Sequence, residues 1–188
     1  GIWNTLVEHE YMFGPDLLIA PVYFGHTKKW QVYLPQGKWC DFWSGAALQG
    51  GSDCIVDAGL DQIPVFARAG AIIPFLDGNP DTLLPSEDSK TKTATADLRL
   101  QIYPGADGEF KMYDGSTFQW SEQSRVLSIH HVPSPRWISF CCMGSEQSFS
   151  YVTGADGTSL SLTMGSLTNE SKYMRFWVES STIYQVKM

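Results

Sequence analysis

The sequence has 188 residues, which suits one or two domains, and 43% of them are hydrophobic, enough to build buried cores. A formal net charge of −7 and scattered basic residues argue against nucleic acid or an anionic membrane as a partner. No apolar stretch approaches the ~20 residues that span a bilayer, and the N-terminus lacks the pattern of a signal peptide. We therefore expect no nucleic-acid or membrane partner, and the localisation and oligomeric state stay undecided.

The first segment of the chain predicts two short strands. Tyr11–Gly14 has the pattern of a strand that runs into a turn at Pro15-Asp16, and Leu17–Val22 has apolar residues on both faces. A short strand that is apolar on both faces belongs inside a larger structure. Nothing earlier in the chain could flank the first strand. We therefore interpret Gly1 as a cut within a longer polypeptide and residues 1–15 as the stub of another domain.

The rest of the chain is dominated by strand patterns. Trp30–Leu34, Leu98–Tyr103 and Glu109–Tyr113 alternate between apolar and polar residues, and Pro104–Gly108 has the composition of a hairpin turn. Further β-rich runs follow at Val126–Val132, Trp137–Cys142, Phe149–Val152, Ser159–Met164, Tyr173–Val178 and Thr182–Val186. Many short strands separated by turn residues predict antiparallel sandwiches.

A polar stretch divides the chain. Residues 78–96 hold Pro80, Pro85 and a run of charged and hydroxylated residues with few apolar ones, which is typical of a linker. We predict four parts. These are a terminal stub at residues 1–15, a proximal β-domain at 16–77, the linker at 78–96 and a distal β-domain at 97–188.

Four motifs in this order resemble the C-terminal region of glycoside hydrolase family 31, which includes α-glucosidases and α-xylosidases. The motifs are Tyr11–Val22, Tyr33–Gly45, Ile63–Pro74 and Ile102–Phe110. The resemblance fades after about residue 120. The sequence also departs from the family at Cys40, where a Tyr is frequent, and at Tyr113-Asp114-Gly115, where the family has a more acidic loop.

The resemblance implies an all-β fold of two antiparallel β-sandwich domains, preceded by the last strand of a (β/α)₈ barrel. It also implies a parent enzyme that hydrolyses O-glycosyl bonds with retention, a reaction that needs two carboxyl groups. In the family both acids lie upstream of the first motif. We therefore predict no catalytic, cofactor-binding or metal-binding residue and no cofactor, and we expect this chain alone to be inactive. Its expected partner is the upstream catalytic barrel.

We interpret several candidate catalytic or metal-binding residues as solvated or structural. The carboxylates of Asp53, Asp57 and Asp61 are expected in water. Glu8, His9 and Glu10 lie near the end of the barrel, where a solvated loop is favoured over an approach to the pocket. Adjacent histidines at 130 and 131 suit a metal poorly, and Ser128 with His130 lacks the third group of a catalytic triad.

Tryptophans raise a second hypothesis. Aromatic residues make up 13% of the chain, and exposed aromatic faces stack on sugar rings. Trp120, Trp137 or Trp177 could therefore form a platform for an oligosaccharide, although packing in the core is favoured. The alternative function is a free-standing carbohydrate-binding module or an assembly domain.

Two further questions stay open in the sequence. Arg68 lies in an otherwise apolar strand, so it either docks the proximal domain on the barrel or forms an internal ion pair or a bond to carbonyl groups. Cys40 and Cys54 could form a disulfide or remain packed free thiols. Cys141-Cys142 lacks a second ligand pair at zinc spacing. A sequon at residues 169–171 would matter only in a secreted protein.

Overall fold

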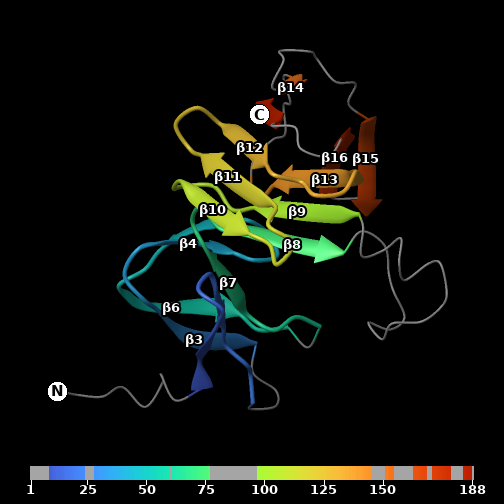
Figure 1. Ribbon diagram of the computed structural model, residues 1–188. Coiled ribbons are helices and arrows are strands. Elements are labelled where there is room, and N and C mark those ends of the chain that lie inside the picture. The colour runs from blue at the N-terminus through green and yellow to red at the C-terminus, as the bar shows by residue number, and fades with distance from the viewer. Residues whose placement is uncertain are drawn as a thin grey trace.

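The computed structural model describes residues 9–23, 28–59, 61–76, 97–144, 151–154, 163–168, 171–178 and 184–187. The regular structure of these residues consists of seventeen strands, with no α-helix among them (Figure 1). Glu8, the predicted linker at 78–96 and the first two residues of the sequon fall outside the described residues.

The N-terminal half forms one five-stranded sheet and a two-stranded ribbon. The sheet has the order β1 (Tyr11–Phe13), β2 (Leu17–Ile19), β7 (Val65–Arg68), β4 (Lys38–Asp41) and β5 (Ala47–Gln49). The ribbon pairs β3 (Lys29–Leu34) with β6 (Ser52–Asp57). All these pairs are antiparallel. A core that includes Val32, Leu34, Trp39 and Phe66 fills the space between the sheet and the ribbon.

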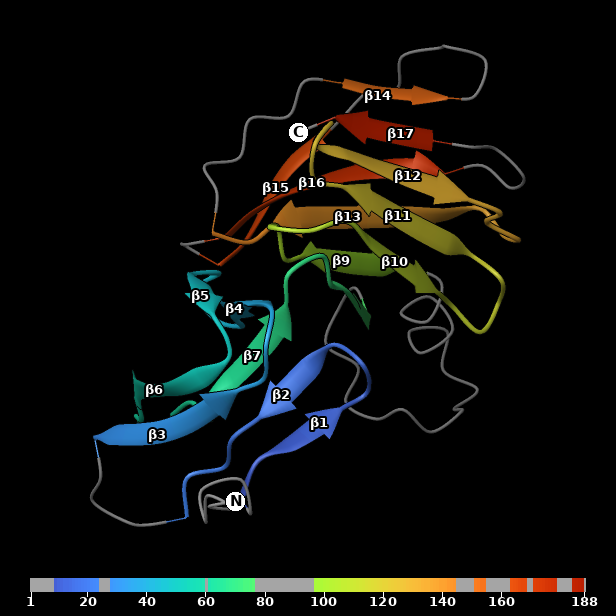
Figure 2. The same ribbon diagram turned by 90° about the vertical axis from the view of Figure 1, so that its left-hand side faces the viewer.

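The C-terminal half forms two further five-stranded sheets (Figure 2). One has the order β10 (Gly108–Lys111), β11 (Thr117–Ser121), β12 (Val126–His130), β17 (Tyr184–Lys187) and β14 (Tyr151–Gly154). The other has the order β15 (Thr163–Thr168), β16 (Ser171–Val178), β13 (Arg136–Cys142), β9 (Leu98–Ile102) and β8 (Ile72–Leu76). Strands β9 and β13 are parallel, and the other pairs are antiparallel.

The period-two pattern of the strands builds the core between these two sheets. In β9, Leu98, Leu100 and Ile102 are buried while Arg99 and Gln101 point to the other face. The same alternation places Phe118 and Trp120 of β11 against the opposite sheet. Successive side chains of a strand point to opposite faces, so one apolar row per strand is enough to close a sandwich.

The all-β fold of antiparallel sheets is confirmed. Three details differ from the sequence prediction. The hairpin predicted at Pro104–Gly108 is wrong, because β9 pairs with β8 and β13 while β10 pairs with β11 in the other sheet. Ile72–Leu76 was assigned to the proximal domain, yet β8 pairs with β9 and lies in the distal sheet, because Ile72 packs in the distal core. Tyr11–Phe13 forms an antiparallel hairpin with β2 in the proximal sheet. The division into domains and the origin of β1 as a barrel strand stay predictions.

Candidate functional site: the N-terminal hairpin and the junction between the sandwiches

An apolar strip lies on the N-terminal hairpin. Strand β1 is the edge of its sheet, and Tyr11, Met12 and Phe13 are all exposed there, with Phe13 at 67%. Tyr23 is exposed too, and its ring contacts those of His9 at 4.1 Å and Trp30 at 5.1 Å between centroids. Tyr11 and Phe13 point to one face of β1 and Met12 to the other, so these side chains are gathered along the edge of the sheet. Large exposed apolar side chains at one edge mark an interaction surface. We call Tyr11, Met12, Phe13 and Tyr23 the hairpin strip.

Polar contacts fix this hairpin on the proximal sandwich. The Glu10 carboxylate accepts a hydrogen bond of 2.9 Å from the Tyr33 N–H. Arg68 donates from Nε to the Pro15 carbonyl at 3.0 Å and from its backbone N–H to the Asp16 carbonyl at 2.8 Å. Its guanidinium also lies 4.5 Å from the centroid of the Trp39 ring. Arg68 therefore binds carbonyl groups within this chain, at the turn of the hairpin.

Two carboxyl groups at the base of the hairpin are perturbed. Burial raises the pKa of Glu10, against the lowering effect of the Tyr33 N–H, and the nearby Asp53 raises it further. Burial also raises the pKa of Asp16, while the positive charge of Arg68 opposes the shift. Desolvation disfavours the charged form of a carboxyl group, so both shifts report partial burial of the hairpin base.

The two sandwiches meet at an apolar junction. Cys40, Ala67, Ala71 and Tyr103 form a separate buried cluster, with Leu17, Phe42, Ile73 and Met143 packed against it. The Tyr103 hydroxyl donates to the Phe42 carbonyl at 3.0 Å, and its backbone carbonyl accepts from the Gly70 N–H at 2.6 Å. Because the cluster takes residues from both halves, neither core ends in solvent on this side.

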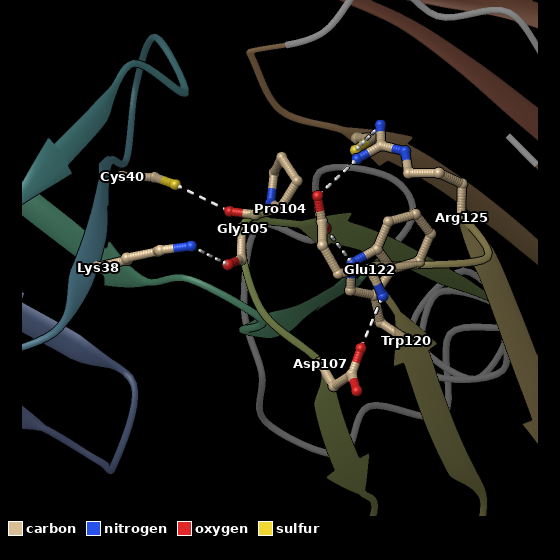
Figure 3. A network of polar contacts seen from close by, with 9 residues as sticks. Lys38, Cys40, Pro104, Gly105, Asp107, Trp120, Glu122 and Arg125 are labelled. Atoms are coloured by element: carbon tan, nitrogen blue, oxygen red, sulfur yellow. Dashed lines mark hydrogen bonds and ion pairs between the residues drawn. The ribbon is translucent and has the colours of Figure 1, made fainter.

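Short polar contacts surround the junction. Lys38 donates from Nζ to the Gly105 carbonyl at 3.2 Å, and the Cys40 thiol lies 3.5 Å from the Pro104 carbonyl (Figure 3). Both contacts join β4 to the loop before β10. In both contacts the acceptor is a backbone carbonyl rather than a charged side chain. The geometry of the junction therefore depends on the backbone path of that loop.

Close approaches of glycine backbones set the spacing of the junction. Gly70 has φ +89°, and a Cβ at this position would overlap the Asp107 carbonyl. A Cβ at Gly108 would overlap the Gly70 carbonyl, and Gly45 and Gly144 exclude each other's Cβ in the same way. In the sequence these residues look like ordinary turn glycines, because the fact that they meet one another depends on the tertiary structure.

Trp120 packs in the distal core and does not form a platform. Its ring is 2% exposed, and its Nε1 donates to the Glu122 carboxylate at 2.9 Å (Figure 3). Arg125 lies 5.0 Å over the same ring and 3.4 Å from Glu122. The Glu122 N–H in turn donates to Asp107 at 2.8 Å, which links this network to the junction loop.

The other candidate catalytic or metal-binding residues do not form a common site in the structure. Asp53 accepts a hydrogen bond from Gln31, Asp57 pairs with Lys29 at 3.6 Å, and Asp61 is exposed. Ser128 lines a shallow groove of about 500 Å³ with Glu109, Gln119 and Trp120, without a histidine among the lining residues. His130 and His131 are not part of any cluster of metal-binding side chains, and none is found in the part of the chain that the structure describes.

All four cysteines are free thiols. The alternative of a Cys40–Cys54 disulfide is therefore wrong, because Cys40 lies in β4 at the junction while Cys54 lies in the β3–β6 ribbon. Burial raises the pKa of Cys40 and of Cys54, and it raises the pKa of Cys141 to about 11. Buried thiols of this kind pack as small apolar groups.

Trp137 and Trp177 lie together on the outer face of the distal sheet that contains β13 and β16. They are cross-strand partners with ring centroids 5.5 Å apart, and Trp177 is 40% exposed.

The described residues include no helix long and apolar enough to cross a membrane.

The described residues form two β-sandwiches joined by a tight apolar junction, with an exposed apolar strip on the first hairpin. Residues 3–73 match the family model described as "Glycosyl hydrolase family 31 C-terminal domain". The chain is 39% identical over 137 residues to an alpha-xylosidase of Saccharolobus solfataricus, a match that covers 65% of this chain and 18% of that protein. It is 43% identical over 99 residues to an isomaltosyltransferase of Sporosarcina globispora, covering 52% of this chain and 9% of that protein.

Solved structures share the fold of this chain over almost its whole length. A cycloalternan-forming enzyme from Listeria monocytogenes, solved with a pentasaccharide substrate, superposes with a TM-score of 0.71 at 25% identity, covering 96% of this chain and 19% of that one. A Flavobacterium johnsoniae dextranase of family 31 has the same fold, with a TM-score of 0.70 at 18% identity. Residues 3–73 therefore belong to the C-terminal domain of glycoside hydrolase family 31, and the chain as a whole has the fold of the C-terminal region of such enzymes. It spans less than a fifth of the length of the curated relatives named above.

Proposed function

We propose that this chain is a non-catalytic C-terminal part of a retaining α-glycosidase and that it supports the catalytic barrel. The observation that carries the proposal is the hairpin strip at the N-terminal end of the described chain. Anchoring by Arg68 and Glu10 holds the strip in a fixed position while its apolar side chains face outward. A rigid, exposed apolar strip near the N-terminal end of the described residues is suited to pack against a preceding domain.

The length of the relatives supports a preceding domain. The match to the alpha-xylosidase leaves more than four fifths of that protein outside this chain. A retaining glycosidase needs two carboxyl groups about 5–5.5 Å apart. The acids that cleave the substrate therefore belong, in this proposal, to the preceding part of the protein.

The docking role can be tested with a pair of matched substitutions. Phe13 is 67% exposed on β1, and Ile55 is 68% exposed on β6. In the full-length protein, Phe13→Ser should lower the free energy of unfolding by about 2 kcal/mol or more, because it removes a buried aromatic ring from the contact with the barrel. Ile55→Ser should change it by less than about 0.5 kcal/mol. Both are measured by thermal unfolding with glycosidase assays in parallel.

In the isolated 188-residue chain the same Phe13→Ser variant should leave the stability unchanged, since the ring is in water there. Equal effects of the two substitutions in the full-length protein would reject the docking role. For the isolated chain we expect no release of nitrophenol from 4-nitrophenyl α-glucoside or α-xyloside. Hydrolysis that persists through purification to constant specific activity would contradict the non-catalytic assignment.

A further inference from the structure

The outer face of the sheet formed by β16, β13, β9 and β8 carries an unusual set of side chains. Ile138 and Phe176 point into the distal core, so their neighbours Trp137, Arg175 and Trp177 point outward. On the next strands Arg99 and Phe75 continue the same face as cross-strand partners. We call Trp177, Trp137, Arg175, Arg99 and Phe75 the tryptophan–arginine face.

Cation–π contacts order the two arginine side chains of this face. The Arg175 guanidinium lies 4.9 Å over the Trp137 ring, and the Arg99 guanidinium lies 5.1 Å over the Phe75 ring. The Trp137 and Trp177 planes meet at 69°. Cation–π contacts restrict the long arginine side chains, so less conformational entropy is lost when such a side chain binds a ligand. Trp177, at 40% exposure, presents the accessible aromatic surface of the face.

Hydrogen-bonding groups lie beside the aromatic pair. The Asp97 carboxylate accepts the backbone N–H of Trp137 at 3.1 Å and pairs with Arg175 at 3.2 Å, and both charged side chains keep part of their surface in solvent. Ser139 lies between Arg175 and Arg99 in the register of the strands. Its hydroxyl and the Arg99 Nε are buried without a hydrogen-bond partner among the described residues. Unsatisfied polar groups of this kind are rare in folded proteins and call for an explanation.

We propose that the tryptophan–arginine face is a non-catalytic binding surface for an α-linked glucan. A pyranose ring has an apolar C–H face that stacks on an indole, and its neighbouring hydroxyls match planar groups such as guanidinium and carboxylate, which form paired hydrogen bonds. The face offers all three groups within one sheet: the Trp177 indole, the Arg175 guanidinium and the Asp97 carboxylate. The choice of an α-linked ligand rests on the proposed function. The location of the site rests on the geometry of the tryptophan–arginine face.

The test uses the 188-residue chain and two trisaccharides, isomaltotriose and maltotriose, with β-linked cellotriose as the comparison. Each is titrated into labelled protein while the indole N–H signals are followed by NMR, with Trp177 and Trp137 assigned from their Phe variants. The two α-linked sugars should shift both indole signals saturably with millimolar dissociation constants, and cellotriose should not. Trp177→Ala should weaken binding at least fivefold, while Trp177→Phe should retain most of the affinity.

Trp43 provides the matched control, since it is 46% exposed on the proximal half. Trp43→Ala should leave the titration unchanged. Folding of each variant is checked by the signal of the buried Trp120 indole. Absence of any shift, an equal response to cellotriose, or retention of full affinity in a folded Trp177→Ala variant would overturn the proposal. These outcomes are independent of the Phe13 experiment, so failure of the glucan site and failure of barrel docking can be distinguished.

Discussion

Arg136 and Asp114 form an ion pair of 2.7 Å between the β10–β11 turn and the start of β13, and their side chains are only 8% and 15% exposed. The Asp114 carboxylate also accepts the Ser116 N–H at 2.9 Å. Burial alone would raise the pKa of Asp114, but the Ser116 N–H and the Arg136 charge outweigh it, and the net pKa is lowered. This turn contains Tyr113-Asp114-Gly115, where the sequence departs from the more acidic loop of the family. The Asp114 carboxylate in it stabilises the fold through its contacts with Arg136 and Ser116.

The lowered pKa predicts an acid-dependent loss of stability. A carboxyl group whose folded pKa lies below the unfolded value of about 3.9 stabilises the fold above that pH, and the stabilisation disappears as the pH falls through the folded pKa. Asp114→Asn should lower the free energy of unfolding by about 3 kcal/mol at pH 7, because the Arg136 charge loses its partner. The difference from wild type should shrink below about pH 4. Urea unfolding at pH 7 and pH 3 measures both effects.

The exposed pair of Lys29 and Asp57 is the control for this prediction. Its atoms are 3.6 Å apart with both side chains largely in solvent. Asp57→Asn should change the free energy of unfolding by less than about 1 kcal/mol at either pH. A similar loss in both variants would show that the buried pair has no special weight.

At the scale of elements, the β1–β2 hairpin is held by few contacts for its exposed position. Only one edge of β1 is paired, and Arg68 supplies the side-chain bond to its turn. Planar, fixed Nε geometry makes arginine hard to replace by lysine at such a site. The hairpin is therefore the element whose position is most sensitive to a single side chain.

Arg68→Lys should loosen the hairpin selectively. It keeps the charge beside Asp16 but removes the Nε bond to the Pro15 carbonyl and the flat stacking on Trp39. We expect cleavage near residues 13–16 by a non-specific protease to become several-fold faster, with a loss of about 1–2 kcal/mol in global stability. Lys38→Arg, at the junction, is the control and should leave the cleavage rate near residue 14 unchanged. An unchanged cleavage rate in Arg68→Lys would show that the backbone pairing of β1 and β2 suffices.

At the scale of the whole molecule, the two sandwiches are coupled by the junction. A shared apolar cluster and glycine backbones in contact leave little room for one half to rotate against the other. Strand β8 also follows β7 after a short turn, although the two strands belong to different halves. Dense contacts across a boundary favour a single cooperative unit over two independent domains.

The chain should consequently unfold in one calorimetric transition. Gly70→Ala should split or broaden that transition and lower the first midpoint by at least several degrees, because a methyl group overlaps the Asp107 carbonyl at a positive φ. Gly14→Ala is the matched control: φ is +67°, but nothing lies within 4 Å of the added Cβ. It should lower stability by only about 1–2 kcal/mol with the single transition intact. Two separate transitions in the wild-type chain would contradict the coupling.

The strands themselves could be predicted because their information is local. Period-two alternation in Leu98–Tyr103 predicts a strand, which forms as β9. The hairpin predicted at Pro104–Gly108 does not form, because β9 and β10 join different sheets. The motifs at Tyr33–Gly45 and Ile63–Pro74 were likewise sufficient to predict the family and the all-β class. In each case the pattern repeats over a few consecutive residues, which is the range that a sequence displays directly.

Partnerships between distant residues were decided only by the tertiary structure. The sequence did not distinguish the buried Trp120 from the exposed Trp177, since both lie in β-rich runs and each follows a Phe within two residues. It also left Arg68 and the cysteines undecided, and it did not reveal that Ile72–Leu76 pairs with β9 in the distal sheet. Burial, pairing between strands and contact between glycines such as Gly70 and Gly108 depend on how separate segments meet, and the energy of that meeting comes from packing rather than from local propensity.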